Sequence, residues 1–268
     1  MNEIKKFYNT YGIREWKRLI KTPFNKLELD TTFYYLEKYL PKKGLILDAG
    51  GGPGRYSILL AKKGYHLVLL DLSRKMLEIA KKKIKEEKVE SKFEMVIEGN
   101  VTNLSMFKDN TFDATLCLGG VISHLIKKSD RDKAIQELKR VTKKNSPIFI
   151  SVIGRLGVLK MAPIYFPNEI TAKYFSTFRD TGNYYGGFGF THMHGFLLKD
   201  FKELIVKNKL KPIKFIGLEG LSSSIGKYVN RLAKNKKQWE IWINTHYKTC
   251  EIPSIVDTSE HILCVCKK

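Results

Sequence analysis

The fold of this chain is decided by the stretch Leu45-Ile46-Leu47-Asp48-Ala49-Gly50-Gly51-Gly52-Pro53-Gly54. A short apolar run ends at an acidic residue, and four glycines follow within five positions. An apolar run that stops at glycines predicts a buried strand leading into a loop. Glycine lets the backbone turn tightly and leaves room for a ligand against it. The stretch therefore predicts a strand and a ligand-binding loop, although a tight turn without a ligand also fits these glycines taken alone.

A second apolar run, Val68-Leu69-Leu70, ends at Asp71, seventeen positions after Gly54. A strand, a glycine loop, a helix and a second strand tipped by a carboxylate form a nucleotide site, because that carboxylate can accept both hydroxyls of a ribose. The dinucleotide pattern G-x-G-x-x-G fails, since Arg55 or Ser57 stands where the third glycine belongs. An NAD-dependent function is therefore disfavoured. A P-loop is also disfavoured, because G-x-x-x-x-G-K-S/T is absent.

The pattern that fits is acid-x-G-x-G-x-G, formed by Asp48, Gly50, Gly52 and Gly54. With this motif the chain resembles the class I S-adenosylmethionine (SAM)-dependent methyltransferases. The resemblance extends to three further stretches that are similar to the family's second motif, adenine contact and fourth strand with its loop: Asp71-Leu72-Ser73, Glu98-Gly99-Asn100-Val101 and residues 112–120. It covers roughly residues 40–155.

The resemblance implies an α/β fold of the Rossmann-like methyltransferase type. This fold is a doubly wound, mostly parallel seven-stranded sheet whose last strand runs antiparallel beside the fifth. The resemblance also implies SAM as cofactor and S-adenosylhomocysteine as its product. It assigns to the cofactor site Asp48, Gly50, Gly51, Gly52, Gly54, Asp71, Leu72, Asn100, Val101, Leu118 and Gly119. In this set Asp48 orients the loop, Asp71 takes the ribose hydroxyls, and Asn100 faces the adenine, where the family often has aspartate.

Apolar runs separated by helical patterns continue along the chain. They predict strands over residues 93–98, 112–118, 148–153, 212–218 and 261–266. Between strands, apolar residues recur at helical spacing, as in Met76, Leu77, Ala80 and Ile84. Because strands alternate with helices, the pattern favours a parallel sheet that is covered by helices on both faces.

We expect one domain over residues 1–268, because no glycine-, serine- or proline-rich linker and no repeat divides the chain. Residues 1–40 have a mostly helical pattern with a break near Pro23, and we expect an N-terminal helical cap. Residues 155–196 and 219–258 interrupt the alternation and are predicted to be insertions that cover the substrate. The aromatic residues of the first insertion suit either the wall of an apolar pocket or the packing core of a cap.

Composition restricts the cellular setting. No apolar run approaches the length of a membrane-spanning helix, and the first residues lack the apolar core of a signal peptide. We therefore expect a cytoplasmic protein without a membrane partner. The four cysteines show no C-x-x-C spacing, so we expect buried thiols and no metal site.

The formal net charge of +21 has two explanations. A basic surface attracts phosphate, so RNA is one candidate partner. Lysine greatly outnumbers arginine, however, and most lysines fall on predicted helix faces, where they keep the surface hydrated. We favour the second explanation. The densest basic cluster, Lys234 to Lys237 beside Arg231, is the best candidate for an anion-binding patch.

Histidines and tyrosines supply the candidates for substrate chemistry. His124 is the histidine nearest to the expected methyl-transfer site, and it is either a general base or a structural residue. His192 and His194 alternate, so a strand would put both rings on one face, but no nearby carboxylate or cysteine completes a metal site. We expect these two histidines, with Tyr11 and Tyr185, to contact the substrate.

In methyl transfer the sulfonium is itself a strong electrophile with a neutral leaving group. The enzyme mainly aligns the nucleophile and excludes water, and a base is needed only where the nucleophile must lose a proton. We therefore predict a SAM-dependent methyltransferase that acts on a small or medium-sized metabolite by in-line displacement. The alternatives are a tRNA or rRNA methyltransferase, a non-catalytic SAM-binding protein, and an enzyme resembling spermidine synthase. The sequence leaves the oligomeric state open.

Overall fold

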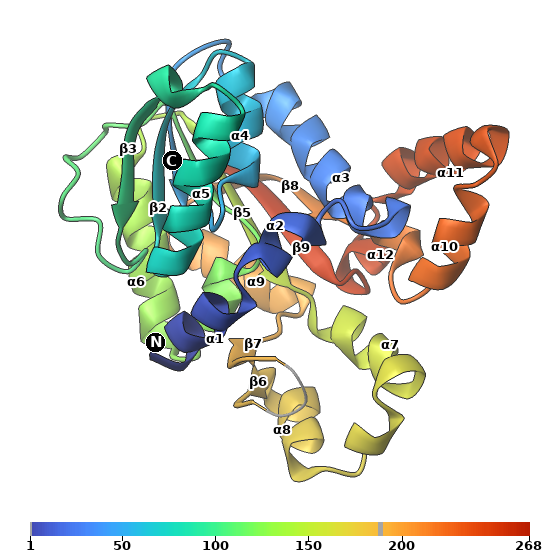
Figure 1. The fold of residues 1–268 in the computed structure, drawn as a ribbon. Helices are drawn as coiled ribbons and strands as arrows, with labels where there is room; N and C mark the ends of the chain where they lie inside the picture. The colour runs from blue at the N-terminus through green and yellow to red at the C-terminus, as the bar shows by residue number, and fades with distance from the viewer. Residues whose placement is uncertain (1, 187–189) are drawn as a thin grey trace.

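The computed structural model describes residues 2–186 and 190–268, and a seven-stranded sheet lies at its centre (Figure 1). Along the sheet the strands are, in order, β3 (Phe93–Glu98), β2 (His66–Asp71), β1 (Leu45–Ala49), β4 (Ala114–Cys117), β5 (Pro147–Ile153), β9 (His261–Lys267) and β8 (Lys211–Gly217). The strands from β1 to β5 are parallel, whereas β9 runs antiparallel to both neighbours. The prediction of a doubly wound, mostly parallel seven-stranded sheet is confirmed.

Helices cover both faces of the sheet (Figure 1). One layer holds α3 (Pro23–Tyr39), α4 (Arg55–Lys62) and α5 (Arg74–Glu86), and the other holds α6 (Lys128–Val141) and α9 (Leu198–Lys207). Successive side chains of a strand point to opposite faces. Ile46 therefore packs with the first layer and Leu47 with the second. All seven residues of β5 are buried, as expected for a strand covered on both sides.

Helix boundaries follow local capping signals. α5 begins after Ser73, whose hydroxyl accepts the N–H of Met76 at 3.2 Å. The N-terminal helical segment breaks before Pro23, where Thr22 caps α3 by accepting the N–H of Asn25 at 3.2 Å. Proline suits this first turn because its missing N–H has no partner in the helix. Four short 3₁₀ helices are η1 (Glu90–Lys92), η2 (Val121–His124), η3 (Pro167–Glu169) and η4 (Gly220–Ser222).

Three groups of elements extend this core (Figure 1). They are α1 (Asn2–Tyr11) with α2 (Ile13–Arg18); α7 (Arg155–Tyr165) with α8 (Lys173–Thr181), β6 (Asn183–Tyr184) and β7 (Met193–His194); and α10 (Gly226–Leu232) with α11 (Lys236–Thr249) and α12 (Pro253–Asp257). Within the part of the chain that the structure describes, no helix combines the length and the apolar character needed to cross a membrane.

All four cysteines are free and buried, in agreement with the expectation from their spacing. Cys117 lies in β4, and Cys264 and Cys266 share one face of β9, within the core formed with α6 and α9. Cys250 caps the end of α11, where its sulfur lies 3.4 Å from the hydroxyl of Tyr35.

Candidate active site

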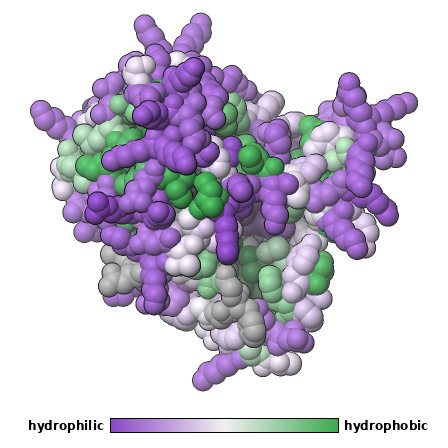
Figure 2. Space-filling view, viewed as in Figure 1, coloured by the Kyte–Doolittle hydropathy of each residue, from purple (hydrophilic) through white to green (hydrophobic). Residues whose placement is uncertain are grey.

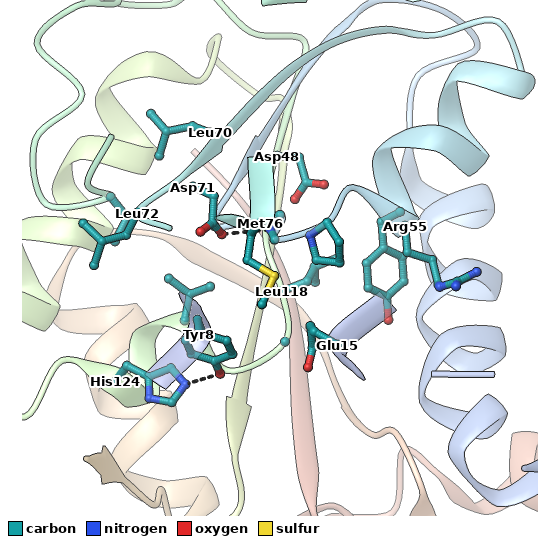
Figure 3. Close-up of a pocket in the computed structure, with 18 of the residues that line it drawn as sticks. Tyr8, Glu15, Asp48, Arg55, Leu70, Asp71, Leu72, Met76, Leu118 and His124 are labelled. Atoms are coloured by element: carbon teal, nitrogen blue, oxygen red, sulfur yellow. Dashed lines mark hydrogen bonds between the residues drawn. The ribbon is translucent and has the colours of Figure 1, made fainter. Parts of the chain in front are cut away.

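The carboxyl ends of β1, β2, β3 and β4 meet at one edge of the sheet, where a crevice opens (Figure 3). The chain leaves β1 and β4 toward opposite helical layers, so the crevice lies where the strand order reverses. A cavity of about 130 Å³ occupies this position. Its walls include ten of the eleven residues predicted for the cofactor: Asp48, Gly50, Gly51, Gly52, Asp71, Leu72, Asn100, Val101, Leu118 and Gly119. We call it the cofactor cavity.

The glycines of the first loop have different roles. A side chain at Gly50 would collide with Val121, and one at Gly51 would collide with Asp48. Gly52 differs, because a Cβ there would have no atom within 4 Å and the backbone φ is +55°. Since Gly52 borders the cofactor cavity, its bare backbone keeps space open for a ligand.

Gly54 does not border the cofactor cavity, contrary to the prediction. It caps α4 in a left-handed conformation with a φ of 82°. A Cβ at this position would lie 3.3 Å from Leu69 and 3.5 Å from Ala80. The glycine therefore permits the turn and the close packing of α4 on β2 and α5.

Asp48 lies beneath the loop and is fully buried. Its Oδ2 accepts the hydroxyl of Ser57 at 2.6 Å, which links the end of β1 to α4. Its Oδ1 has no hydrogen-bond partner among the described residues. Burial raises the pKa of this carboxyl to about 6. A buried polar atom without a partner at a cavity wall points to a donor that the ligand supplies.

Asp71 ends β2 and both holds the loop and faces the cofactor cavity (Figure 3). Its Oδ2 accepts the N–H of Gly52 at 2.8 Å, and its Oδ1 accepts the N–H of Ser73 at 2.7 Å. Burial raises its pKa to about 6, and these two N–H groups oppose the rise. Each carboxylate oxygen keeps a second lone pair. Asp71 can therefore accept ribose hydroxyls while it positions Gly52.

The ends of β3 and β4 complete the floor of the cofactor cavity. The side-chain oxygen of Asn100 accepts the N–H of Thr102 at 3.0 Å, which closes a local turn. Asn100 borders the cofactor cavity at the end of β3, where the family resemblance places the adenine. After β4, Gly119 has a φ of +68° and open space at its Cβ position, so the backbone leaves the cavity unobstructed there as well.

Side chains of the N-terminal helices also line the cofactor cavity, and no sequence motif marks them. They include Tyr8 from α1, and Glu15 and Arg18 from α2. Glu15 and Arg18 form an ion pair at 2.9 Å with i, i+3 spacing. This pattern is common on exposed helices, so it does not distinguish a site. α2 is anchored by Arg55, whose guanidinium lies 3.9 Å from the ring centre of Trp16 and donates to its carbonyl oxygen.

A second cavity, of about 450 Å³, adjoins the cofactor cavity and shares with it Tyr8, Glu15, Arg18 and Gly119. Its other walls are mostly apolar and include Phe7, Tyr11, Phe166, Phe175, Phe178 and Tyr184. On this side of the molecule a hollow opens between the main body and the lower elements, while hydrophilic residues cover most of the surrounding face (Figure 2). The elements between α7 and β7 thus cover a space next to the cofactor cavity. We call this space the cap cavity.

Alternation along the β6–β7 hairpin decides which side chains line the cap cavity. Tyr184 and Met193 are paired across the hairpin and line the cavity. Their neighbours point the other way, because successive strand residues face opposite sides. Neither His192, which precedes β7, nor His194 borders the cap cavity, and Tyr185 is 55% exposed. Of the four residues predicted to contact substrate, the structure places Tyr11 alone at the cap cavity.

The side chain of His194 is held in place by neighbouring side chains. Its Nδ1 lies 2.7 Å from the side-chain oxygen of Asn183, and its ring packs edge-on against Phe196. Burial, and then the charges of Arg131 and Arg155, lower its pKa to about 3. The ring is therefore neutral and fixed within the hairpin.

His124 ends η2, after β4, and is buried. Its Nε2 lies 2.8 Å from the hydroxyl of Tyr8, and its Nδ1 lies 2.9 Å from the carbonyl oxygen of His192 (Figure 3). Burial lowers its pKa, and the hydrogen bond to His192 opposes that change. His124 borders the cofactor cavity but not the cap cavity. It therefore reaches the cap cavity only through Tyr8.

Comparison with known proteins identifies the domain that holds this site. The sequence profile of the methyltransferase domain family matches residues 46–145. A SAM-dependent methyltransferase of Methanosarcina mazei superposes on 87% of this chain and 96% of its own, with a TM-score of 0.61 at 17% identity. The chain carries a class I SAM-dependent methyltransferase domain. The prediction of this enzyme family, with SAM as its cofactor, is confirmed for the domain.

Two curated relatives match part of the chain. A demethylmenaquinone methyltransferase of Thermotoga maritima is 34% identical over 140 residues, which are 51% of each chain. An uncharacterized protein of Methanocaldococcus jannaschii is 30% identical over 164 residues, which are 60% of this chain and 65% of that protein. The chain thus spans less than two thirds of the length of either relative.

The cofactor cavity of the methyltransferase domain fits SAM by its own chemistry. Gly52 and Gly119 leave open space where any other residue would place a side chain. Asp48 offers an oxygen without a partner, which suits an amine of the cofactor, directly or through water. Asp71 offers lone pairs for the ribose hydroxyls. An amino acid joined to a nucleoside, as in SAM, requires hydrogen-bonding groups of this kind.

A buried ion network fastens the N-terminal helices of the methyltransferase domain to β9. Arg18 pairs with Glu15 and Glu28, and Nδ1 of His261 lies 2.7 Å from Glu219 and 3.8 Å from Glu28. Burial opposes a charged imidazolium, but the carboxylates of Glu28 and Glu219 outweigh it and raise the pKa of His261 to about 9. Two carboxylates and a histidine also suit a metal ion. Arg18 and charged His261 already neutralise them here, so ion pairing accounts for the cluster.

This network predicts that stability falls as the pH rises from about 6.5 to about 9. His261 has a pKa of 6.5 as an isolated group and about 9 in the folded protein. Its contribution to stability is therefore complete below pH 6.5 and is lost as the pH passes through 9. The free energy of unfolding, measured by urea titration across this interval, should decline in the wild type and decline less in His261→Gln.

His66→Gln is the matched control for this measurement. His66 also pairs with a glutamate, Glu94, but both side chains are about half exposed, and exposed pairs contribute little. This variant should keep the wild-type pH profile. An equal slope for the wild type and His261→Gln would show that the network does not set the pH dependence.

Residues 219–258 cover neither cavity, contrary to the prediction. They pack on α3, where Nε2 of His246 lies 2.8 Å from the hydroxyl of Thr31 and the ring of Tyr247 lies 4.6 Å from that of Tyr34. α10 and α11 project away from α7 and α8 (Figure 1). The basic cluster between them therefore lies on the projecting part and not at the mouth of the cap cavity.

Proposed function

We propose that this chain is an enzyme that transfers the methyl group of SAM to a small or medium-sized metabolite with an apolar, ring-containing body. The observation that carries the proposal is the cap cavity, whose volume of about 450 Å³ is that of a small-molecule site. It adjoins the cofactor cavity at Tyr8 and Gly119, and its walls are largely aromatic. The T. maritima relative, named for the methylation of demethylmenaquinone, supports a ring compound as acceptor.

Charge favours a metabolite over RNA as the acceptor. The carboxyls of Glu169 and Glu260 border the cap cavity, and neither forms an ion pair with a described lysine or arginine. Burial raises the pKa of both carboxyls, and the neighbouring Glu219 helps to raise that of Glu260 to about 7. The two cations that border the cavity, Arg18 and His261, already form ion pairs, so no unpaired positive charge among the described lining residues attracts phosphate. The dense lysine cluster belongs to the α10–α11 part, and none of its residues borders the cap cavity.

The residues of the site would work mainly by positioning. When bound, SAM supplies a methyl group on a positively charged sulfur. Asp71 and the loop at Gly52 would hold the nucleoside, and the N-terminal helices with the cap would hold the acceptor and exclude water. Alignment of two reactants alone can contribute several kcal/mol to lowering the barrier. A proton must be removed only when the acceptor carries one.

The proposal is tested in two stages. Calorimetric titration with SAM and with S-adenosylhomocysteine should show micromolar binding of both. Labelled methyl from SAM should then appear on reduced 1,4-naphthoquinone or simple phenols and not on unmodified tRNA. Methylated tRNA with steeply salt-dependent binding would assign the enzyme to RNA instead.

Three further outcomes of these experiments contradict the proposal. Binding of SAM without transfer to any acceptor would indicate a non-catalytic SAM-binding protein. Tighter binding of decarboxylated SAM than of SAM would indicate transfer of another group. Binding of neither SAM nor S-adenosylhomocysteine would remove the basis of the proposal.

A further inference from the structure

We infer that Tyr8 and His124 form a proton relay that deprotonates the methyl acceptor, and that the acceptors are phenols or enols and not nucleophiles without a proton. The inference rests on the methyl transfer proposed above and adds the group that activates the nucleophile. In this relay Tyr8 is the catalytic residue, and His124 is the residue that positions it and receives its proton.

Tyr8 stands between the two cavities. It borders both of them, whereas His124 borders the cofactor cavity alone. The Tyr8 ring lies edge-to-face against Phe7 at 5.3 Å and against His124 at 5.4 Å, so its orientation is held from two sides. Its hydroxyl points at the imidazole of His124 (Figure 3). Tyr8 therefore stands where the methyl donor and the acceptor would meet.

The hydrogen bonds of His124 set the direction in which a proton can move. The carbonyl oxygen of His192, 2.9 Å from Nδ1, can only accept, so Nδ1 carries the proton of the neutral ring. Nε2 then has a lone pair, and the hydroxyl of Tyr8 donates to it across 2.8 Å. The lone pairs of the Tyr8 oxygen remain for a donor in the cap cavity. This is the arrangement of a base that is activated by a second base.

Aromatic rings shield the pair from solvent. His124 is 7% exposed, and the ring of Phe190 lies 5.8 Å from its ring. Phe7 packs against Phe190 at 5.5 Å and extends this cover toward Tyr8. A shielded acceptor has little access to bulk water as a proton acceptor, so the protein must supply the route.

The step balances in atoms and charge. The acceptor's oxygen or carbon gives an electron pair to the methyl carbon, the carbon–sulfur bond breaks, and the sulfur keeps the electrons of that bond. The acceptor's proton passes to the Tyr8 oxygen as the Tyr8 proton passes to Nε2 of His124. The positive charge thus moves from sulfur to imidazolium, whose Nδ1–H continues to donate to His192. The imidazolium loses its proton to water after product release.

The first test compares three variants with the wild type. Tyr8→Phe keeps the ring and removes the hydroxyl, and His124→Asn keeps a donor toward His192 but removes Nε2. Tyr228→Phe is the matched control, because Tyr228 on α10 is exposed and borders neither cavity. The acceptors are 4-methylphenol, protonated at about pH 8, and 4-nitrophenol, largely ionised there.

With 4-methylphenol, kcat should fall about 10²- to 10⁴-fold in Tyr8→Phe and His124→Asn, with KM and SAM affinity little changed. With 4-nitrophenol most of that loss should disappear, and Tyr228→Phe should resemble the wild type with both phenols. The double variant should lose no more than either single variant. Equal losses with both phenols, or a change in KM alone, would overturn the relay and leave a purely structural contact.

The second test needs no turnover. ¹⁵N NMR of histidine-labelled protein with S-adenosylhomocysteine should show His124, identified by its loss in His124→Asn, as a neutral ring with its proton on Nδ1. Tyr8→Phe should shift the Nε2 resonance, and Tyr228→Phe should not. A proton on Nε2 would overturn the relay, because Nε2 would then have no lone pair for the Tyr8 proton. If neither phenol is methylated, the proposed function fails for this acceptor class, and the tautomer still decides the relay.

Discussion

Gly52→Val should weaken SAM binding at least about 100-fold, which corresponds to about 2.8 kcal/mol of binding free energy at 1.4 kcal/mol per factor of ten. The backbone φ of +55° at Gly52 strains a β-branched residue. In addition, the new side chain would extend into the cofactor cavity, because no atom lies within 4 Å of the Cβ position. The valine side chain would then occupy part of the cofactor cavity that SAM needs. Calorimetric titration with SAM measures the loss directly.

Gly64→Val separates backbone strain from loss of the ligand's space. Gly64 lies in the turn between α4 and β2 with a φ of +95°, and its Cβ position is also open, but it borders neither cavity. Both variants should therefore melt at lower temperature than the wild type, and only Gly52→Val should lose SAM. Normal SAM binding by Gly52→Val would show that the cofactor does not lie against this loop.

Much of the fold can be predicted from the sequence because its signals are local. The apolar run of β5 and the hydroxyl cap at Ser73 each act within a few residues, and the structure contains both. The antiparallel direction of β9 is different in kind. A buried strand has the same apolar pattern in either direction, so this feature follows from the family resemblance and not from periodicity.

The residues of the cofactor site likewise fall into two groups, those that a sequence motif marks and those that only the packing of distant helices brings there. The loop at Gly52 and the carboxylate of Asp71 are visible in the sequence, because strand ends and glycine turns place them. Tyr8, Glu15 and Arg18 reach the cofactor cavity only because α1 and α2 pack across the strand ends, far along the chain from the loops that they meet. No local pattern encodes that contact.

The β6–β7 hairpin shows what side-chain periodicity can predict and what it cannot. A period of two predicts His192 and His194 on one face of a strand, but β7 begins only at Met193, and the period does not say which face turns inward. Met193 and Tyr184 pair across the hairpin and fill the inward face. The burial of apolar side chains accounts for this orientation, and neither histidine borders the cap cavity.

Asp71→Ala should weaken SAM binding by about two to four orders of magnitude, because it removes two charge-assisted hydrogen bonds worth about 1.5–3 kcal/mol each. The substitution acts twice. It removes the acceptor of the ribose hydroxyls, and it frees the N–H of Gly52, which the carboxylate now holds at 2.8 Å. The measurement is calorimetric titration with SAM at about pH 8, where a carboxyl with a pKa of about 6 is ionised.

Glu98→Gln is the matched control, because Glu98 is the β3 residue in register with Asp71 and ends the neighbouring strand. Its carboxylate is about half exposed and pairs with Lys5 outside the cofactor cavity, so its loss should leave SAM affinity unchanged. In the wild type the affinity for SAM should also fall as the pH drops through about 6, since protonation removes acceptors from Asp71. Unchanged affinity in Asp71→Ala would mean that the ribose is held elsewhere. A loss of equal size in both variants would mean that general electrostatics, and not this carboxylate, sets the affinity.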